Sequence, residues 1–269
     1  MKKILVPTDF SENANLALRY AIQVANKFGS TISVLHAYQV ATSTGNLVSI
    51  DHIVKVDREE ELKALISEIK PLLVTNTRIE SQVIKATSVE SICTAAEKLK
   101  ADIIIMGTKG ADGMKKLFLG STASNVILHT SIPVLAIPSD FQNFHLTNIT
   151  LALDNKKIGD LTLLKPILDL AKGFEAVLDL LTVIDEEHPK AQIDPDLEDY
   201  LKNEGVDYTY FIVKADNIVE GIRKFVAREK SDLLCLIHHP RGLFQNIFGA
   251  SVAKEMVLDS SVPLIVLRG

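Results

Sequence analysis

Cysteine is scarce in this chain, because only two of its 269 residues are cysteines. Cys93 falls in a predicted helix and Cys235 in a predicted strand, and neither belongs to a CxxC motif. A disulfide framework needs several cysteines, and a metal or redox motif needs them close together, so both kinds of site are excluded. We interpret both cysteines as small residues of the core.

Clusters of basic residues and long apolar runs are missing as well. The formal net charge is -5, without the basic patch that would bind nucleic acid or an anionic membrane surface. No apolar run approaches the roughly 18 residues of a membrane-spanning helix, and the first residues show no signal peptide. We therefore expect a cytoplasmic protein that binds neither nucleic acid nor a membrane.

The two commonest nucleotide-binding motifs, GxxxxGK[ST] and GxGxxG, are also absent. What the chain does contain is an internal repeat, in which two segments correspond without a gap. Four pairs of identical residues lie 130 positions apart: Asp102 and Asp232, Phe118 and Phe248, Ser121 and Ser251, and Pro133 and Pro263. The length suits two domains of ordinary size, and we expect them at residues 1–140 and 141–269.

Short apolar strands alternate with amphipathic helices in both halves, which is typical of parallel sheets covered by helices on both faces. In the first half we expect strands at 3–7, 31–38, 78–85, 102–106 and 134–137, and helices at 11–27, 51–73, 89–99 and 121–129. In the second half we expect strands at 149–153, 176–184, 206–214, 232–237 and 264–267, and helices at 160–172, 197–203, 218–228 and 252–258. The predicted fold class is α/β, with two tandem five-stranded, doubly wound, Rossmann-like domains.

A ligand crevice is expected where the first and fourth strands of the first half end, because these strands lie side by side in a doubly wound sheet. Pro7-Thr8-Asp9 ends the first strand and Gly107 ends the fourth. Asp9 has two alternative roles, as a hydrogen-bond acceptor for a vicinal diol or as a cap of the helix that follows. The residues alone leave both roles open.

Glycines with a defined spacing follow the fourth strand: Gly107, two residues, Gly110, nine residues, then Gly120-Ser121-Thr122. Glycine lets the backbone approach a ligand that a Cβ would exclude. The free N–H groups and the dipole at the start of a helix favour phosphate oxygens. We therefore expect a phosphate site here, in which Lys109 either adds positive charge or is a solvated loop lysine.

This glycine motif, with Val6-Pro7-Thr8-Asp9-Phe10-Ser11 before it and Ser131-Ile132-Pro133-Val134 after it, resembles the universal stress protein family over the whole chain. The resemblance implies an adenine nucleotide alpha hydrolase-like fold and ATP as ligand, with ADP and AMP as alternatives and Mg²⁺ held through the phosphates. It implies that Asp9 holds the ribose and that the glycines and Ser121 hold the phosphates. The full expected site is Pro7, Thr8, Asp9, Ala37, Met106, Gly107, Lys109, Gly110, Gly120, Ser121 and Thr122.

The second half lacks the glycines of this motif. Asp154 and Ser251 keep the acidic and hydroxyl positions, but Ile237, Pro240 and Ala250 replace Gly107, Gly110 and Gly120. A branched side chain, a missing N–H donor and a more restricted helix start all disfavour a phosphate cradle. We expect no nucleotide site of this kind in the second half.

By the same resemblance, the strands at 134–137 and 264–267 are expected to pair across the two halves and form a pseudo-dimer within the chain. The resemblance also allows a homodimer through another surface.

His238 and His239 form the one pair of adjacent histidines in the sequence. Adjacent residues of a strand point to opposite sides, and no Cys or carboxylate at ligand spacing accompanies these two. We favour a loop or pocket-lining role over a metal site.

The leading hypothesis is an ATP-binding regulatory protein of the stress response, with one nucleotide site in the first half. A slow ATP hydrolase is an alternative, in which Asp112 is the one acidic residue of the glycine loop that could orient a water. A non-catalytic interaction module with a vestigial site is a second alternative. Since no base, metal anchor and charge-stabilising group occur together, we expect at most weak ATPase activity.

Overall fold

The computed structural model describes residues 1–268, apart from 41–46, 109–120, 142–143, 187–189 and 239–261. The first half contains β1 (Lys3–Pro7), α1 (Glu12–Phe28), β2 (Thr31–Tyr38), α2 (Leu47–Ile69), the 3-10 helix η1 (Lys70–Leu72), β3 (Arg78–Lys85), α3 (Ser88–Leu99), β4 (Ile103–Gly107), α4 (Ser121–His129) and β5 (Val134–Ile137). The second half contains β6 (Asn148–Leu153), η2 (Leu161–Leu164), α5 (Lys165–Phe174), β7 (Val177–Ile184), α6 (Pro195–Glu204), β8 (Tyr208–Lys214), α7 (Ile218–Glu229), β9 (Leu233–His238) and β10 (Leu264–Arg268).

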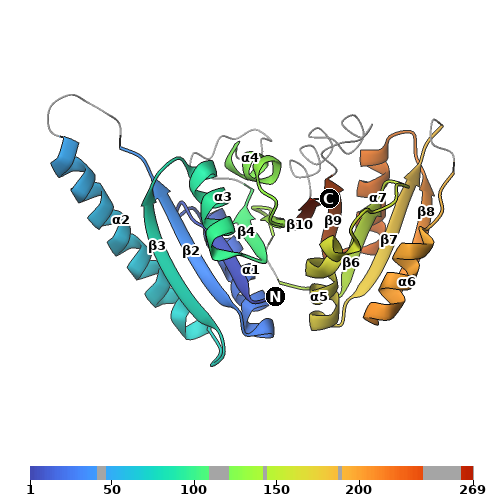
Figure 1. Ribbon diagram of the computed structural model, residues 1–269, viewed down its shortest axis with the longest axis horizontal. Coiled ribbons are helices and arrows are strands. Elements are labelled where there is room, and N and C mark those ends of the chain that lie inside the picture. The colour runs from blue at the N-terminus through green and yellow to red at the C-terminus, as the bar shows by residue number, and fades with distance from the viewer. Residues whose placement is uncertain (41–46, 109–120, 142–143, 187–189, 239–261, 269) are drawn as a thin grey trace.

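All these strands belong to one ten-stranded sheet, in the order β3-β2-β1-β4-β5-β10-β9-β6-β7-β8 (Figure 1). Neighbouring strands run parallel within each half, whereas β5 and β10 run antiparallel, with Ile265 paired to Leu135. The expected five-stranded units and the pairing of their last strands into a pseudo-dimer are thus confirmed. The expected neighbourhood of β1 and β4 is confirmed too, because Ile4 pairs with Ile103.

Two helices differ clearly from the expectation. α2 covers Leu47–Ile69 instead of 51–73, and the 3-10 helix η1 follows it. The helix expected from residue 160 begins as the 3-10 helix η2 and becomes α-helical only at Lys165. Pro166 explains the second difference, because a proline has no N–H to donate to the carbonyl four residues earlier. The helix expected at 252–258 lies outside the described residues.

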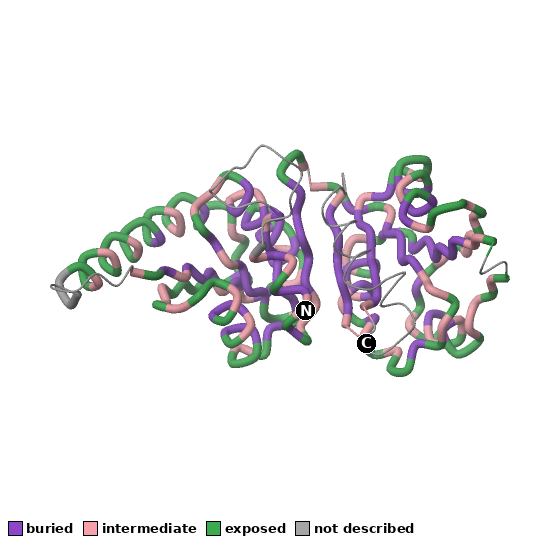
Figure 2. Tube along the Cα trace, turned by 90° about the horizontal axis from the view of Figure 1, so that it is seen from above, coloured by how far each residue is buried: buried purple, intermediate pink, exposed green. Residues whose placement is uncertain are grey.

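Apolar side chains cover both faces of the sheet. One core contains side chains of α1, α2, α5 and α6 from both halves, and the other lies under α3, α4 and α7. The central strands are buried along nearly their whole length, as expected for parallel strands covered on both sides (Figure 2). No helix in the described part of the chain is long and apolar enough to cross a membrane.

The two halves use the same device to fix the start of their first strand. The Asp102 carboxylate accepts a hydrogen bond from the backbone N–H of Lys3 (2.8 Å) at the start of β1. Asp232, its equivalent in the repeat, accepts hydrogen bonds from the backbone N–H groups of Thr147 (2.7 Å) and Asn148 (3.0 Å) at the start of β6. Each aspartate thereby holds the amino end of one strand against its neighbour.

Aromatic side chains join the two halves on the face of α1 and α5. The rings of Phe28 and Phe174, at the ends of these two helices, lie 6.1 Å apart. Phe144, in the segment between the halves, lies 5.2 Å from Phe174 and 4.7 Å from Tyr20. A Cβ at Gly173 would collide with the Phe28 ring, so this glycine allows the close approach of α1 and α5.

Candidate functional site

The turn after β1 places Asp9 at the carboxyl end of the sheet. Asp9 Oδ1 accepts a hydrogen bond from the backbone N–H of Ser11 (3.0 Å), and Phe10 between them has a positive φ of 63°. Ser11, not Asp9, is the N-cap of α1, because its hydroxyl oxygen accepts from the Ala14 N–H (3.1 Å). Asp9 therefore supports the turn, and its side chain is exposed.

The second half forms the same turn. Asp154 Oδ1 accepts a hydrogen bond from the Lys156 N–H (3.1 Å), and Asn155 has a φ of 60°. Asp9 and Asp154 are 145 positions apart, the same distance that separates Lys3 from Asn148 at the strand starts. The acidic turn is therefore a property of the repeat, and the difference between the halves must come from other residues.

A buried histidine supports the end of β1 from the neighbouring strand. His36 Nδ1 lies 2.9 Å from the Thr8 carbonyl oxygen, which can only accept, so Nδ1 carries the proton. The Phe10 ring packs 4.5 Å from the imidazole. Thr8 is also buried, and its hydroxyl oxygen accepts from the Phe10 N–H (3.0 Å). His36 is thus a hydrogen-bonded core residue.

Burial lowers the pKa of His36 below its usual value, although the hydrogen bond to Thr8 acts in the opposite direction. The unfolded chain therefore takes up a proton at a higher pH than the folded chain. We expect the stabilising effect of neutral His36 to be complete above about pH 6.5 and to be lost as the pH falls toward the lower pKa. Between neutral and mildly acidic pH, the free energy of unfolding should fall less in His36→Asn than in the unchanged protein. Chemical unfolding of both proteins at both pH values measures this difference. Equal losses in the two proteins would contradict this role of His36.

Gly107, at the end of β4, packs against the first turn of α1. A Cβ at this position would lie 2.7 Å from Asn13 Oδ1 and 2.9 Å from the Asn13 carbonyl oxygen. The buried Asn13 amide donates to the Ile137 carbonyl oxygen (3.1 Å), which also accepts from the Thr108 N–H (3.1 Å). Gly107 therefore has a packing role, in addition to its expected role of letting the backbone approach a ligand.

The same position is filled differently in the second half. Ile237 corresponds to Gly107, and Ile158 corresponds to Asn13. Both isoleucines are buried. Since α5 begins at Lys165, the segment after Asp154 does not place a helical turn where α1 lies on Gly107. The glycine and the polar contact of the first half are thus replaced together by apolar packing.

The described residues of the expected site lie at the carboxyl ends of the neighbouring strands β1, β2 and β4 and at the start of α4. Thr8 and Met106 are buried, Pro7, Ala37, Gly107 and Thr122 are half-buried, and Asp9 is exposed. The backbone of α4 begins at Ser121, and the first N–H groups of a helix have no partner within the helix itself. Lys109, Gly110 and Gly120 lie outside the described residues, as do Asp112, His239, Pro240, Ala250 and Ser251.

Two residues of this region were not predicted, Asn13 and Thr108. A signal for Asn13 exists in the sequence, because it lies four residues before Ala17 on the apolar face of α1. A polar residue on a buried face needs a partner, which it finds in the Ile137 carbonyl oxygen. Thr108 carries no comparable signal, since its hydrogen bond to the Ile137 carbonyl oxygen depends on the neighbouring strand β5.

Comparison with known proteins agrees with the geometry. The sequence profile of the Universal stress protein family matches residues 1–138 and 145–268. A universal stress protein of Methanocaldococcus jannaschii is 30% identical over 51% of this chain and 81% of its own length. One from Thermus aquaticus is 30% identical over 51% of this chain and 98% of its own length.

Solved structures extend the match to the whole chain. The crystal structure of a universal stress protein from Archaeoglobus fulgidus superposes with a TM-score of 0.73, at 20% identity, over 99% of this chain and 96% of its own. At that identity the likeness concerns the fold, and it covers both halves together with their arrangement. The protein therefore belongs to the universal stress protein family, with two family domains in tandem.

Proposed function

We propose that this protein binds one adenine nucleotide at the carboxyl ends of β1 and β4, and that it acts as a regulatory protein of the stress response. The observation that supports this best is that two paired strands from distant parts of the sequence, β1 and β4, lead to Asp9 and Gly107 at the same edge of the sheet. A doubly wound sheet binds ligands at this kind of switch point. The proposed functional unit is residues 1–140, with residues 141–269 as its partner.

Each part of the nucleotide has a proposed contact. The exposed Asp9 carboxylate is suited to accept hydrogen bonds from ribose hydroxyls. The start of α4, with Ser121 and Thr122, is suited to phosphate oxygens. Gly110, Gly120 and Lys109 are included in the proposed phosphate site because they are part of the family's glycine motif. Ala37 and Met106, at the ends of β2 and β4, are the proposed neighbours of the base.

The proposed ligand is ATP, with ADP and AMP as alternatives. Mg²⁺ would be held through the phosphates, because no group of three or more His, Cys, Asp or Glu side chains in the described part of the chain could hold a metal ion. When bound there, the ion would neutralise phosphate charge. Binding is the proposed activity, and hydrolysis stays an alternative that depends on Asp112.

Only the first half is proposed to hold nucleotide. Asp154 repeats the turn of Asp9, but Ile237 is buried in the core where the first half has Gly107. Asn155 also donates a hydrogen bond to the Lys190 carbonyl oxygen (3.0 Å), which ties the turn after β6 to the segment before α6. The second half would then act as the structural partner that a second subunit provides in a dimer.

Calorimetric titration of nucleotide-free protein with ATP, with and without Mg²⁺, tests this proposal. The expected result is one site per chain. Two sites per chain would contradict the asymmetry between the halves. Absence of binding at millimolar ATP would favour the interaction-module alternative.

A further inference from the structure

The repeat makes α1 and α5 equivalent helices. Both end at a left-handed C-cap residue, Gly29 with φ 64° and Glu175 with φ 57°, and these are 146 positions apart. The same offset relates Tyr20 to Pro166 and Arg19 to Lys165. The pseudo-twofold arrangement of the sheet therefore predicts similar surroundings for these pairs of positions.

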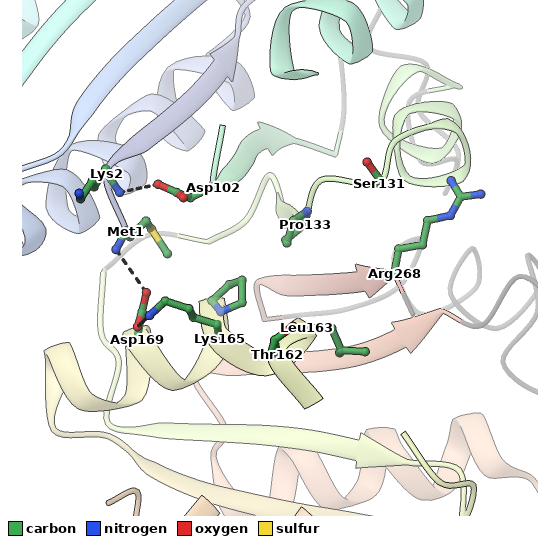
Figure 3. Close-up of a pocket in the computed structure, with 11 residues that line it drawn as sticks. Met1, Lys2, Asp102, Ser131, Pro133, Thr162, Leu163, Lys165, Asp169 and Arg268 are labelled. Carbon is green, nitrogen blue, oxygen red and sulfur yellow. Dashed lines mark hydrogen bonds and ion pairs between the residues drawn. The ribbon is translucent and has the colours of Figure 1, made fainter. Parts of the chain in front are cut away.

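The surroundings differ. On α1, the segment between the halves places the rings of Phe141 and Phe144 at 5.5 and 4.7 Å from the ring of Tyr20, which is buried. On α5, the region around Pro166 opens into a cavity of about 370 Å³ (Figure 3). That volume lies in the range of about 300–1,000 Å³ that is usual for small-molecule sites.

Both halves contribute walls to this pocket. Met1 and Pro133 line it from the first half, and Leu163 and Pro166 line it from the second. These side chains are apolar, as are Phe141 and Phe144, which cover the equivalent surface of α1. Figure 3 shows that the pocket lies between the start of β1, the segment before β5, the start of α5 and the end of β10.

The residues that line the pocket carry more positive than negative side chains: the cations are Lys2, Lys165 and Arg268, and the carboxylates are Asp102 and Asp169. Both carboxylates already have partners. Asp102 accepts from the backbone N–H groups of Lys2 and Lys3. Asp169 is shared by two cations, Lys165 Nζ at 2.7 Å and the Met1 ammonium at 3.2 Å. Among the described residues that line the pocket, positive charge is therefore in excess.

Arg268 adds to this surplus. Its Nη1 donates to the carbonyl oxygens of Leu128 (3.2 Å) and Thr130 (3.0 Å) at the end of α4. Carbonyl groups satisfy hydrogen bonds but do not cancel the charge of a guanidinium group. A ligand with an apolar body and a negative group matches these surroundings better than a neutral or cationic one.

We propose that this pocket binds a small aromatic carboxylate. Its ring would occupy, on α5, the place that the phenylalanine rings take on α1, and its carboxylate would lie toward Lys165. Because residues of both halves line the pocket, such a ligand would bridge the two domains. The proposal is independent of the nucleotide site, which lies at the other ends of β1 and β4.

Binding of 1-naphthoate, followed by calorimetry and by ligand-observed NMR on the full chain, tests the proposal. We expect one site per chain, and at least about fivefold weaker binding of the uncharged 1-naphthalenemethanol. Lys165→Gln should weaken naphthoate binding by a similar factor. Arg19→Gln, at the equivalent and equally exposed position of α1, should leave it unchanged.

A second variant fills the pocket. Thr162 lines the pocket and is exposed, so Thr162→Trp adds volume there without removing a core side chain. We expect it to abolish naphthoate binding while ATP stoichiometry stays the same. Absence of naphthoate binding at millimolar concentration, unchanged binding in Thr162→Trp, or equal affinity for the uncharged analogue would each overturn the proposal.

Discussion

Gly107→Ala is expected to lower the free energy of unfolding by about 2–3 kcal/mol, the upper part of the range of about 1–3 kcal/mol that is typical of an overpacked core position. The added Cβ would lie 2.7 Å from Asn13 Oδ1 and 2.9 Å from the Asn13 carbonyl oxygen. The side chain of Asn13 could rotate only by giving up its hydrogen bond to Ile137. The carbonyl belongs to the backbone of α1, so the helix itself would have to move.

Gly159→Ala is the matched control, because no atom lies within 4 Å of the position of its Cβ. We expect no loss of stability in this variant, within about 0.5 kcal/mol. Urea unfolding of both variants, compared by midpoint and slope, measures the difference. Equal stability of Gly107→Ala and the unchanged protein would mean that α1 does not pack on the end of β4 as described.

This packing role also determines how the nucleotide site is best tested. A bulky substitution at Gly107 would displace α1 and, with it, the turn that carries Asp9. Loss of binding in such a variant would then follow from the altered fold as readily as from a lost ligand contact. Asp9 is a better position, since its side chain is exposed and an isosteric replacement is available.

Asp9→Asn is expected to weaken ATP binding by about 10- to 100-fold, which corresponds to roughly 1.5–3 kcal/mol for hydrogen bonds to a charged group. Asparagine keeps the oxygen that accepts from the Ser11 N–H, so the turn into α1 should persist. What it loses is the negative charge offered to the ribose hydroxyls. Calorimetry with both proteins measures the change, and thermal unfolding checks that the fold is retained.

Asp154→Asn provides the matched control, because Asp154 makes the same turn in the second half. It should bind ATP with unchanged affinity. A nucleotide that lacks the 2′-hydroxyl should bind the unchanged protein more weakly than ATP does. Asp9→Asn should reduce its affinity less than it reduces the affinity for ATP, since part of the interaction with Asp9 is already missing. Equal losses in Asp9→Asn and Asp154→Asn would place the binding determinant elsewhere.

Much of the fold could be predicted from the sequence because the repeat and the strand and helix periodicities agree. The side-by-side position of β1 and β4 follows from the general rules for doubly wound sheets. The pairing of β5 with β10 depended on the family resemblance, since nothing in Val134–Ile137 alone distinguishes an edge strand from a paired one. The start of α5 differs from the expectation because Pro166 limits the α-helix, whereas the apolar periodicity continues before it.

The candidate site could be predicted where a residue with suitable chemistry closely follows a recognisable strand, as Asp9 follows β1. It was less predictable where a residue acts through a tertiary contact. The role of Gly107 against Asn13 depends on the distance between a strand end and a helix, which no local pattern encodes. The pocket beside Pro166 is a further example, because residues far apart in the sequence, such as Met1, Pro133 and Pro166, line it together.

The central claim is that one adenine nucleotide binds per chain, in the first half. Its most direct test is to denature the freshly purified protein, before any ligand is added, and to identify and count the released nucleotide by mass spectrometry. We predict about one adenine nucleotide per chain, which Asp9→Asn loses and Asp154→Asn retains. Two nucleotides per chain, or none together with no thermal shift on adding ATP, would contradict the claim.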